Sequence, residues 1–423
     1  MTRVLYTDYS GCLKSRDKEI FDLLREEEIR QNDGIELIAS ENYTAPEVLE
    51  AVGSVAMWKY AEGYPGKRYY GGCRYIDAIE NLAIERLKKV FNAEYVNVQP
   101  HSGTEANLAA YAAFLKPGDK VMAMGLNFGG HLSHITNLSL SSQLYQSVFY
   151  GVGADGHLNM DEIREMAIRE KPQMILAGAS AYPFIIDFKA FREIADEVGA
   201  YLMVDMAHIC GLVAGGVHPS PIPYADVVTS TTHKTARGPR GAIIIAKKEY
   251  EKQINSAVFP RIQGGSLENV IAGKAVMAKL MLDDSFKEYA QNVVNNAKIL
   301  ANELKSNGIK LVGDGTENHL MLLDLSETEF TGKQIENLLG EANITVNKNM
   351  IPFDTKKPTQ TSGIRLGTPA ITTRGMGKQE MQLIGKFIAG IIKKELKPEN
   401  IVDSVKELCD MYPIYKGGAP EIE

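Results

Sequence analysis

A lysine within an unusually polar run is the first candidate for chemistry. Lys234 follows the hydroxyl and imidazole residues Thr229–His233 and precedes Arg-Gly-Pro-Arg-Gly at residues 237–241. A lysine is usually a surface residue, but cations and hydrogen-bond donors gathered around it suit an anionic cofactor. Because a lysine amine can form a Schiff base with an aldehyde, Lys234 is the candidate for holding such a cofactor.

Polar residues also follow other apolar runs that we expect to be strands. Asp205, after the run at 201–204, either caps a helix or neutralises a buried cation such as a protonated pyridine nitrogen, and His208 comes three residues later. Residues 99–104 carry small and hydroxyl side chains before a helix, where free N–H groups suit a phosphate. An ordinary helix cap is the alternative there. His131 follows the run at 121–124, and its ring can stack on an aromatic group.

The histidines leave a metal site open as a second interpretation. His131-x-x-His134 and Asp205-x-x-His208 could combine as ligands. That spacing lacks the paired histidines and the glutamate base of an HExxH helix, so we expect no metal.

The segment from Glu62 to Gly72 has the least ordinary composition of the chain. It contains three tyrosines, four glycines and a proline, which excludes a helix or a central strand. A polar loop of this kind either supports a protein interface or lines a site.

The elements that must position these residues alternate between strand and helix patterns. Short apolar runs predict strands at residues 95–98, 121–124, 174–177, 201–204, 227–228 and 241–246. Helical patterns occur at 104–115, 161–169 and 188–198. This alternation predicts an α/β fold with a mainly parallel sheet covered on both faces. Ligands bind beyond the carboxyl ends of such strands, which is where the candidate residues lie.

The N-terminal part of the chain resembles an arm. A charged helix is predicted at residues 16–31, with Ser15 as its cap and an apolar stripe formed by Ile20, Leu23 and Leu24. Pro46 is expected at the first position of another helix.

The C-terminal part changes rhythm. A long helix is expected to begin near residue 276, and strands follow at 319–325, 344–346 and 364–366, before a helix at 377–394. We therefore divide the chain into an N-terminal arm (1–55), a large cofactor-binding domain (56–275) and a small C-terminal α+β domain (276–423).

Composition excludes several classes of protein. The 423 residues carry a net charge of −7 without the basic surplus or stripe of a nucleic-acid binder. No apolar stretch approaches the roughly eighteen residues of a membrane span, and the first thirty residues lack the apolar core of a signal peptide. The four cysteines form no CxxC pair, so neither a zinc site nor a disulfide framework is predicted. A cytoplasmic location fits this cysteine usage.

Taken together and in order, these segments resemble the serine hydroxymethyltransferase family. The matching blocks span nearly the whole chain and are residues 37–42 (LIASEN), 60–72, 99–103, 129–134, 204–208, 231–241, 347–349 (NKN) and 362–365 (SGIR). The resemblance implies an aminotransferase-like fold (fold type I) whose large domain contains a mainly parallel seven-stranded sheet. It also implies a homodimer that binds pyridoxal phosphate between its subunits and transfers a hydroxymethyl unit between serine and glycine with a reduced pterin carrier.

The resemblance assigns cofactor roles to individual residues. Lys234 resembles the lysine that bonds to the cofactor, Asp205 the partner of the pyridine nitrogen, and His131 the histidine stacked on the ring. The other cofactor positions are Ser102, Gly103 and His233 on the phosphate side, Ser180 and His208 near the ring hydroxyl, and Tyr60 and Gly265 from the neighbouring subunit.

The resemblance also assigns substrate and carrier roles. Arg365 resembles the residue that binds the substrate carboxylate, with Ser40 and His208 close by. Glu62 resembles the acid–base group near the serine hydroxyl, and Tyr70 its companion. Leu126 and Asn349 match carrier-binding positions. The implied catalytic set is Lys234, Glu62, Tyr70, His131 and Asp205.

The chain departs from the family pattern on the carrier side, at Asn127-Phe128, at residues 260–263 and at Phe353. These departures bear on the carrier, for which tetrahydrofolate is the default and tetrahydromethanopterin the alternative. Other readings are another pyridoxal-phosphate enzyme, such as a threonine aldolase or an aminotransferase, and a catalytically silent scaffold. Glu62 in its tyrosine-rich loop favours the transferase, and the intact Lys234 and Arg365 argue against a scaffold.

Overall fold

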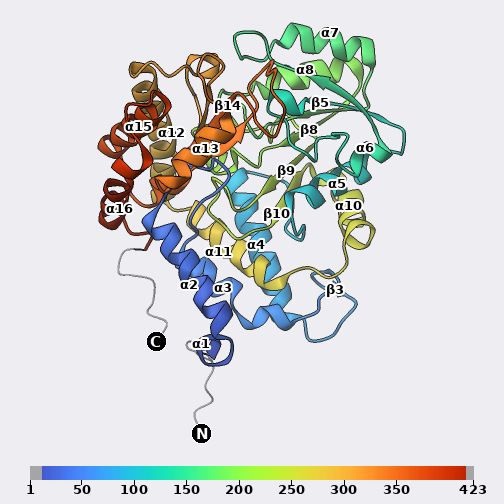
Figure 1. The fold of residues 1–423 in the computed structure, drawn as a ribbon. Coiled ribbons are helices and arrows are strands. Elements are labelled where there is room, and N and C mark those ends of the chain that lie inside the picture. Colours follow the sequence, from blue (N-terminus) through green and yellow to red (C-terminus); the bar gives the residue numbers. More distant parts are fainter. Residues whose placement is uncertain (1–11, 416–423) are drawn as a thin grey trace.

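A computed structural model of the chain describes residues 12–415 (Figure 1). Its centre is a seven-stranded sheet in the order β4-β10-β9-β8-β7-β5-β6. The strands β5 to β9 are mutually parallel along this order, and β10 runs antiparallel to both of its neighbours. Their bounds are β4 Tyr95–Asn97, β5 Lys120–Met124, β6 Gln146–Tyr150, β7 Met174–Ala177, β8 Tyr201–Asp205, β9 Val227–Thr231 and β10 Ala242–Ala246.

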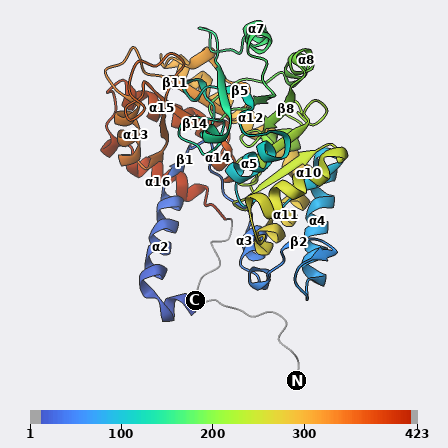
Figure 2. The same ribbon diagram turned by 90° about the vertical axis from the view of Figure 1, so that its right-hand side faces the viewer.

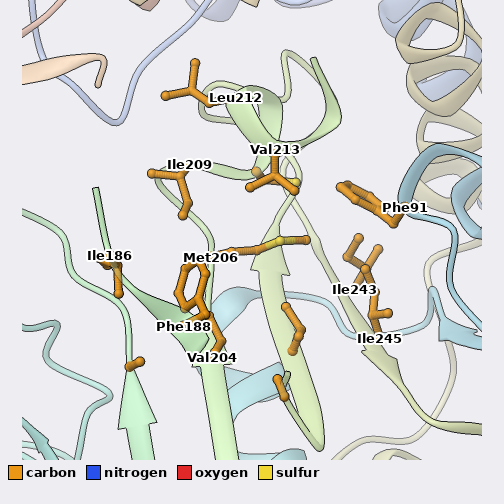
Figure 3. Close-up of a cluster of buried hydrophobic side chains, with 14 of the residues drawn as sticks. Phe91, Ile186, Phe188, Val204, Met206, Ile209, Leu212, Val213, Ile243 and Ile245 are labelled. Carbon is orange, nitrogen blue, oxygen red and sulfur yellow. The ribbon is translucent and has the colours of Figure 1, made fainter. Parts of the chain in front are cut away.

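Apolar side chains point to both faces of this sheet, because successive residues of a strand alternate between faces. On β8, Leu202 and Val204 pack into one core cluster and Met203 into the other. Figure 3 shows the face that carries Val204 and Ile243, which lie there among the side chains of flanking helices. The predicted α/β fold with a mainly parallel, doubly covered sheet is therefore confirmed.

Helices cover each face. One face is packed by α5 (Gly103–Phe114) and α10 (Glu251–Ser256). The other is packed by α4 (Arg74–Phe91), α7 (Met160–Glu170), α8 (Phe188–Val198), α11 (Glu268–Met281) and part of α12 (Asp284–Ser306). The predicted helices at 104–115, 161–169 and 188–198 correspond to α5, α7 and α8.

Six strands of the sheet were expected from apolar runs, and the seventh, β6, was not. Its sequence Gln-Ser-Val-Phe-Tyr forms an edge strand that is only partly buried. An edge strand needs no continuous apolar run, because one side of its ladder faces outward. This is why the pattern search did not find it.

The C-terminal part forms a second layered unit. Strands β11 (Leu320–Asp324), β14 (Gly363–Gly367) and β13 (Asn347–Asn349) make an antiparallel sheet in that order. Helices α12, α13 (Gly332–Glu341), α15 (Lys378–Ile392) and α16 (Val402–Met411) pack against it in a separate core cluster. The strands predicted at 319–325 and 364–366 correspond to β11 and β14, and the helix predicted at 377–394 to α15. The strand predicted at 344–346 corresponds to β12 (Ile344–Thr345), which lies outside this sheet. The long helix expected near residue 276 is wrong: α11 begins at Glu268, and α12 follows it at Asp284.

The N-terminal arm projects from the body of the molecule (Figure 2). Two helices, α1 (Cys12–Arg16) and α2 (Lys18–Asp33), replace the single predicted helix. The cap of α2 is Asp17, whose side chain accepts a hydrogen bond from the N–H of Ile20, so the prediction of Ser15 was wrong. Pro46 begins α3 (Pro46–Val52) as expected.

The arm returns to the body through β1 (Ile35–Glu36), which pairs in parallel with β12 (Ile344–Thr345). We keep the division into residues 1–55, 56–275 and 276–423 as a proposal, supported by the separate core clusters. Among residues 12–415, no helix is both long and apolar enough to cross a membrane.

Candidate active site

A cleft opens beyond the carboxyl ends of the parallel strands. Its lining residues are Gly103, Asn107, His131, His134, Ala179, Ser180, Asp205, Ala207, His208, Thr231 and Lys234. Six of the residues predicted from sequence are therefore brought together. Strand β8 delivers Asp205, β9 ends beside Lys234, and the turn after β5 carries the histidines. The strand ends converge here because parallel strands place all their carboxyl ends on one edge.

Asp205 is held as a buried anion. Its Oδ2 accepts hydrogen bonds from Asn107 Nδ2 at 2.9 Å and His134 Nε2 at 3.0 Å, and its Oδ1 accepts one from the N–H of Ala207 at 3.0 Å. Burial alone raises the pKa of this carboxyl, but the hydrogen bonds and the nearby imidazoles outweigh it and hold the pKa of Asp205 well below its usual range. A carboxylate therefore lies ready for a cation.

Lys234 is the cation-forming group of the same cleft. Its side chain is buried, and within the described residues its Nζ makes no hydrogen bond. Burial lowers the pKa of Lys234 to about 8, while Asp205 opposes this shift and Arg365 adds to it. A neutral amine is therefore far more accessible here than on an exposed lysine, and a neutral amine is the form that attacks an aldehyde.

The start of α5 offers donors to an anion. Ser102 caps the helix by accepting a hydrogen bond from the N–H of Glu105, and Gly103, the first residue of the helix, lines the cleft. The free N–H groups of a first helical turn suit an anion. Thr231 Oγ1, in the cleft lining, and His233 Nδ1 are buried and have no hydrogen-bond partner in the described part of the chain. Unpaired buried polar atoms of this kind are rare, and they fit a ligand with an anionic group at this end.

A buried lysine on α11 holds the chain that leads into α5. Lys274 Nζ donates to the carbonyl oxygens of Val98 at 2.6 Å, Ala242 at 2.8 Å and Pro100 at 3.0 Å. These three acceptors use all three protons of an ammonium group. The segment before Ser102 is thereby fixed against the sheet.

Arg365 lies on β14 with its side chain almost fully buried. Its Nη1 donates to the carbonyl oxygen of Ser180 at 2.6 Å, and its Nε donates to Asn347 Oδ1 at 3.2 Å. These contacts orient the guanidinium, and among residues 12–415 its Nη2 has no hydrogen-bond partner. A fixed guanidinium can bind a carboxylate through two parallel hydrogen bonds. Ser180, whose carbonyl accepts from Nη1, lines the cleft, so the guanidinium lies beside it.

The predicted residues of the tyrosine-rich loop form a different group. The rings of Tyr60 and Tyr70 lie 5.0 Å apart, and a Cβ added to Gly265 would lie 3.4 Å from Tyr60. A Cβ added to Gly264 would likewise lie 3.3 Å from Oε1 of Glu62. None of the predicted residues Tyr60, Glu62, Tyr70 and Gly265 lines the Lys234 cleft of its own chain. Tyr60 and Tyr70 are 56% and 46% exposed, so this group faces outward.

The tyrosine-rich loop is nonetheless rigidly anchored. It contains the short hairpin β2 (Gly63–Tyr64) and β3 (Lys67–Arg68). The buried guanidinium of Arg68 pairs with Asp77 at 2.9 Å and Glu80 at 2.5 Å and donates to the carbonyls of Ala61 and Gly63. A buried charge network of this kind fixes the loop in one conformation. The exposed residues are therefore presented on a firm support.

The remaining predicted residues are not part of the lining of this cleft. Ser40 and His233 line a neighbouring cavity between the arm and residues 238–240. Leu126 begins a short 3-10 turn and is partly exposed, and Asn349 ends β13. The departures Phe128 and Phe353 contact each other edge to face, with ring centroids 5.5 Å apart.

Sequence reasoning missed three residues of this site. Asn107 lies one helical turn after Gly103, a spacing that places it on the same face of α5 and gave a usable signal. His134 was weighed only as a metal ligand, whereas its Nε2 contacts Asp205. His319, which contacts His208, had no local signal. Among the described residues, no group of three or more metal-ligating side chains is placed to hold an ion.

Comparison with known proteins adds a decisive observation. A family model described as serine hydroxymethyltransferase matches residues 13–388. The chain belongs to the serine hydroxymethyltransferase family. Two relatives from Campylobacter jejuni strains, each named serine hydroxymethyltransferase, are 54% identical over 408 residues, which cover 96% of this chain and 99% of each relative. The aminotransferase-like fold inferred from the resemblance is thereby confirmed.

As a member of the serine hydroxymethyltransferase family, the chain is a pyridoxal-phosphate-dependent transferase. It interconverts serine and glycine with a folate one-carbon carrier. Like other members of the family, it assembles from identical subunits. The threonine aldolase, aminotransferase and scaffold readings are not favoured. The buried carboxylate, the buried amine and the donors at the start of α5 fit the ring nitrogen, aldehyde and phosphate of this cofactor.

Proposed function

We propose that Lys234 bonds to pyridoxal phosphate and that Asp205 pairs with its ring nitrogen. The observation that supports this most directly is the ionised carboxylate of Asp205 in the same cleft as the buried amine of Lys234. Gly103, Ser102 and His233 bind the phosphate, together with Tyr60 and Gly265 of the partner subunit. Ser180 and His208 lie near the ring hydroxyl. His131 covers one face of the ring, and burial keeps its imidazole neutral by lowering its pKa to about 4.

Pyridoxal phosphate, when bound, would supply an electron-withdrawing ring that stabilises negative charge at the α-carbon of the amino acid. Asp205 favours the protonated ring nitrogen through its negative charge. Arg365 binds the substrate carboxylate with Ser40 beside it, which fixes the orientation of the bonds at the α-carbon. The partner subunit's Glu62 accepts the proton of the serine hydroxyl as the bond between the α-carbon and the hydroxymethyl carbon breaks. The partner subunit's Tyr70 lies beside Glu62 as its companion.

The active site in this proposal is shared between two copies of the chain. The outward-facing group around Tyr60 and Glu62 supports this, because it is rigidly mounted away from its own Lys234 cleft. The arm offers a further surface for a second copy: α2 has no buried residue, and its apolar Leu23 is 65% exposed. Large exposed apolar side chains along one helix mark an interaction surface.

We propose tetrahydrofolate as the carrier, bound near Leu126 and Asn349. The similarity to the bacterial relatives supports this choice over tetrahydromethanopterin. The Phe128–Phe353 pair offers apolar stacking area to the aryl part of either carrier. The test compares kcat/KM for serine cleavage with the two carriers, and a clear advantage for tetrahydromethanopterin would contradict the proposal.

We also propose a cytoplasmic location. All four cysteines are free thiols, and three of them are buried. Free thiols are typical of a reducing compartment.

The attachment of the cofactor is tested by chemical labelling. Borohydride reduction of the yellow enzyme, followed by peptide mapping, should place the pyridoxyl group on Lys234. The buried Lys274 serves as an internal control, because its amine is fully engaged by three carbonyls. A label on any lysine other than Lys234 would contradict the assignment.

A further inference from the structure

Two buried histidines meet behind the cleft. His208 follows β8 and lines the cleft, whereas His319 precedes β11 and does not. The Nδ1 atom of His208 lies 3.2 Å from the Nε2 atom of His319, and the ring centroids are 5.4 Å apart. Both side chains are buried. The second nitrogen of His208, Nε2, is therefore the one left for a ligand in the cleft.

Only one proton fits between two facing nitrogens that lie 3.2 Å apart, and both rings are neutral. Burial lowers the pKa of His208 well below its usual value, and the cations Lys234 and Arg365 lower it further. Burial also lowers the pKa of His319 to about 3, with Arg365, Lys234 and His218 acting in the same direction. Each ring then carries a single N–H, so the proton between the rings belongs either to His208 or to His319.

The other nitrogen of His319 decides between these two arrangements. His319 Nδ1 is buried and has no hydrogen-bond partner among the described residues. If His208 were the donor, His319 Nδ1 would carry an unpaired buried N–H. Orphaned buried N–H donors are rarer in proteins than under-satisfied acceptors. The favoured arrangement therefore has His319 donating from Nε2 and keeping a bare Nδ1.

We propose that His319 is a positioning residue that fixes His208 as an N–H donor toward the cleft. With Nδ1 of His208 accepting from His319, the proton of His208 must be on Nε2, which faces the ligand. A donor there suits an anionic oxygen, either of the substrate carboxylate or of a ring hydroxyl that has lost its proton. The identity of this oxygen rests on the proposed function, whereas the tautomer of His208 does not.

The structure holds His319 in place from both sides. The preceding residue, Asn318, donates from Nδ2 to the carbonyl oxygens of Tyr182 at 2.9 Å and Phe184 at 3.3 Å. The carbonyl oxygen of His319 accepts a hydrogen bond from the N–H of Thr368 at 3.1 Å. Residues 182–184 follow β7, so the small unit is fastened to the loop that carries Ser180. His208, which follows a strand of the large sheet, is thus oriented by a residue of the smaller C-terminal unit.

The tautomer is measured directly by nitrogen-15 NMR of histidine-labelled enzyme without cofactor. The chain has only eight histidines, and a His208→Asn variant assigns the signal of His208. The expected spectrum shows His208 protonated on Nε2 and bare at Nδ1. Protonation of His208 on Nδ1 in the unmodified enzyme would overturn the proposal, whether or not any variant folds.

Two variants of His319 separate positioning from packing. In His319→Gln, the side-chain amide reaches the place of Nε2 and still donates, so the His208 tautomer should persist. In His319→Leu, the donor is lost, and the His208 signal should become a mixture of tautomers. Glycine affinity of the cofactor-loaded enzyme should fall about tenfold in His319→Leu and stay near normal in His319→Gln.

The outcomes distinguish this inference from the proposed function. An unchanged His208 tautomer in His319→Leu, or equal loss of glycine affinity in both variants, would overturn the positioning role. A pyridoxyl label found away from Lys234 would instead contradict the proposed function and leave the tautomer result standing.

Discussion

The Nε2 atom of His134 lies 3.0 Å from Oδ2 of Asp205, and Nδ1 of the same ring accepts a hydrogen bond from the N–H of His131. The acceptor role of Nδ1 places the proton on Nε2, which therefore donates to the carboxylate. His134 thus serves the charge of Asp205 rather than a metal. The loop that carries His131 is tied to the same carboxylate.

Replacing His134 should make the folded enzyme less stable in acid. The folded pKa of Asp205 lies below its unfolded value of about 4. Its stabilising contribution is therefore complete above the unfolded pKa and is lost as pH falls through the folded pKa. In His134→Leu, the folded pKa rises, so this loss begins at higher pH, and a hydrogen bond to a charged group worth about 1.5–3 kcal/mol disappears. Acid unfolding of the cofactor-free enzyme, followed by circular dichroism, measures the shift. Coincident curves for His134→Leu and the unmodified enzyme would refute the role of His134.

The binding of cofactor to the empty enzyme should depend on the charge of Lys234. Because the pKa of Lys234 is lowered to about 8, the rate of cofactor attachment should rise with pH through a midpoint near that value. Asp205 raises this pKa and Arg365 lowers it. Asp205→Asn should therefore move the midpoint down and Arg365→Met should move it up. Stopped-flow absorbance measures the rates, and shifts of the same sign in both variants would contradict the electrostatic account.

Arg365 should control substrate affinity without controlling cofactor binding. Leaving the substrate carboxylate without its buried partner costs about 2–5 kcal/mol. Arg365→Ala should therefore weaken serine and glycine binding strongly, and cofactor absorbance should remain. Arg365→Lys is the matched control, since it keeps the charge but cannot form two parallel hydrogen bonds. Near-normal serine affinity in Arg365→Ala, measured by spectral titration, would count against the assignment.

Ile135 stands directly after His134 in a left-handed conformation, with φ of 59° and a fully buried side chain. A β-branched residue is disfavoured there. Ile135→Ala loses the packing and keeps the unfavourable backbone, whereas Ile135→Gly loses the packing and relieves it. The glycine variant should therefore be more stable than the alanine variant by about 1 kcal/mol. Urea unfolding compares the two, and a more stable alanine variant would show that the backbone is not strained.

The sequence alone could point to a site residue where its residue type and its position after a strand were enough to identify it. Asp205 could be located because it directly follows a short apolar run, and Lys234 because it comes a few polar residues after another, and parallel strands end at one edge. Ser102 gave the usual signal of a helix cap. The family resemblance supplied Arg365, Glu62 and the carrier positions, which no local pattern indicated.

Other features could not be predicted because they depend on contacts across the fold. His319 lies just before β11, 111 residues further along the chain than His208, and no spacing rule encodes that meeting. The three carbonyls around Lys274 come from two segments far apart in the sequence, the chain just after β4 and the start of β10. Ser15 and Asp17 are both good caps, and only the path of the chain between α1 and α2 selects Asp17.

The central claim is that each active site combines the Lys234 cleft of one chain with the Tyr60–Gly72 loop of another. Glu62→Gln and Lys234→Ala should each be inactive in serine cleavage with tetrahydrofolate. When the two variants are unfolded together and refolded as dimers, each mixed dimer holds one intact site and one doubly altered site. Random pairing in a symmetric dimer should then restore about one quarter of the normal activity.

The decisive measurement is the activity of this mixture against each variant refolded alone, with mixed dimers counted by native mass spectrometry. The account predicts activity that rises in proportion to the mixed dimers. Proven mixed dimers without activity would contradict the shared site.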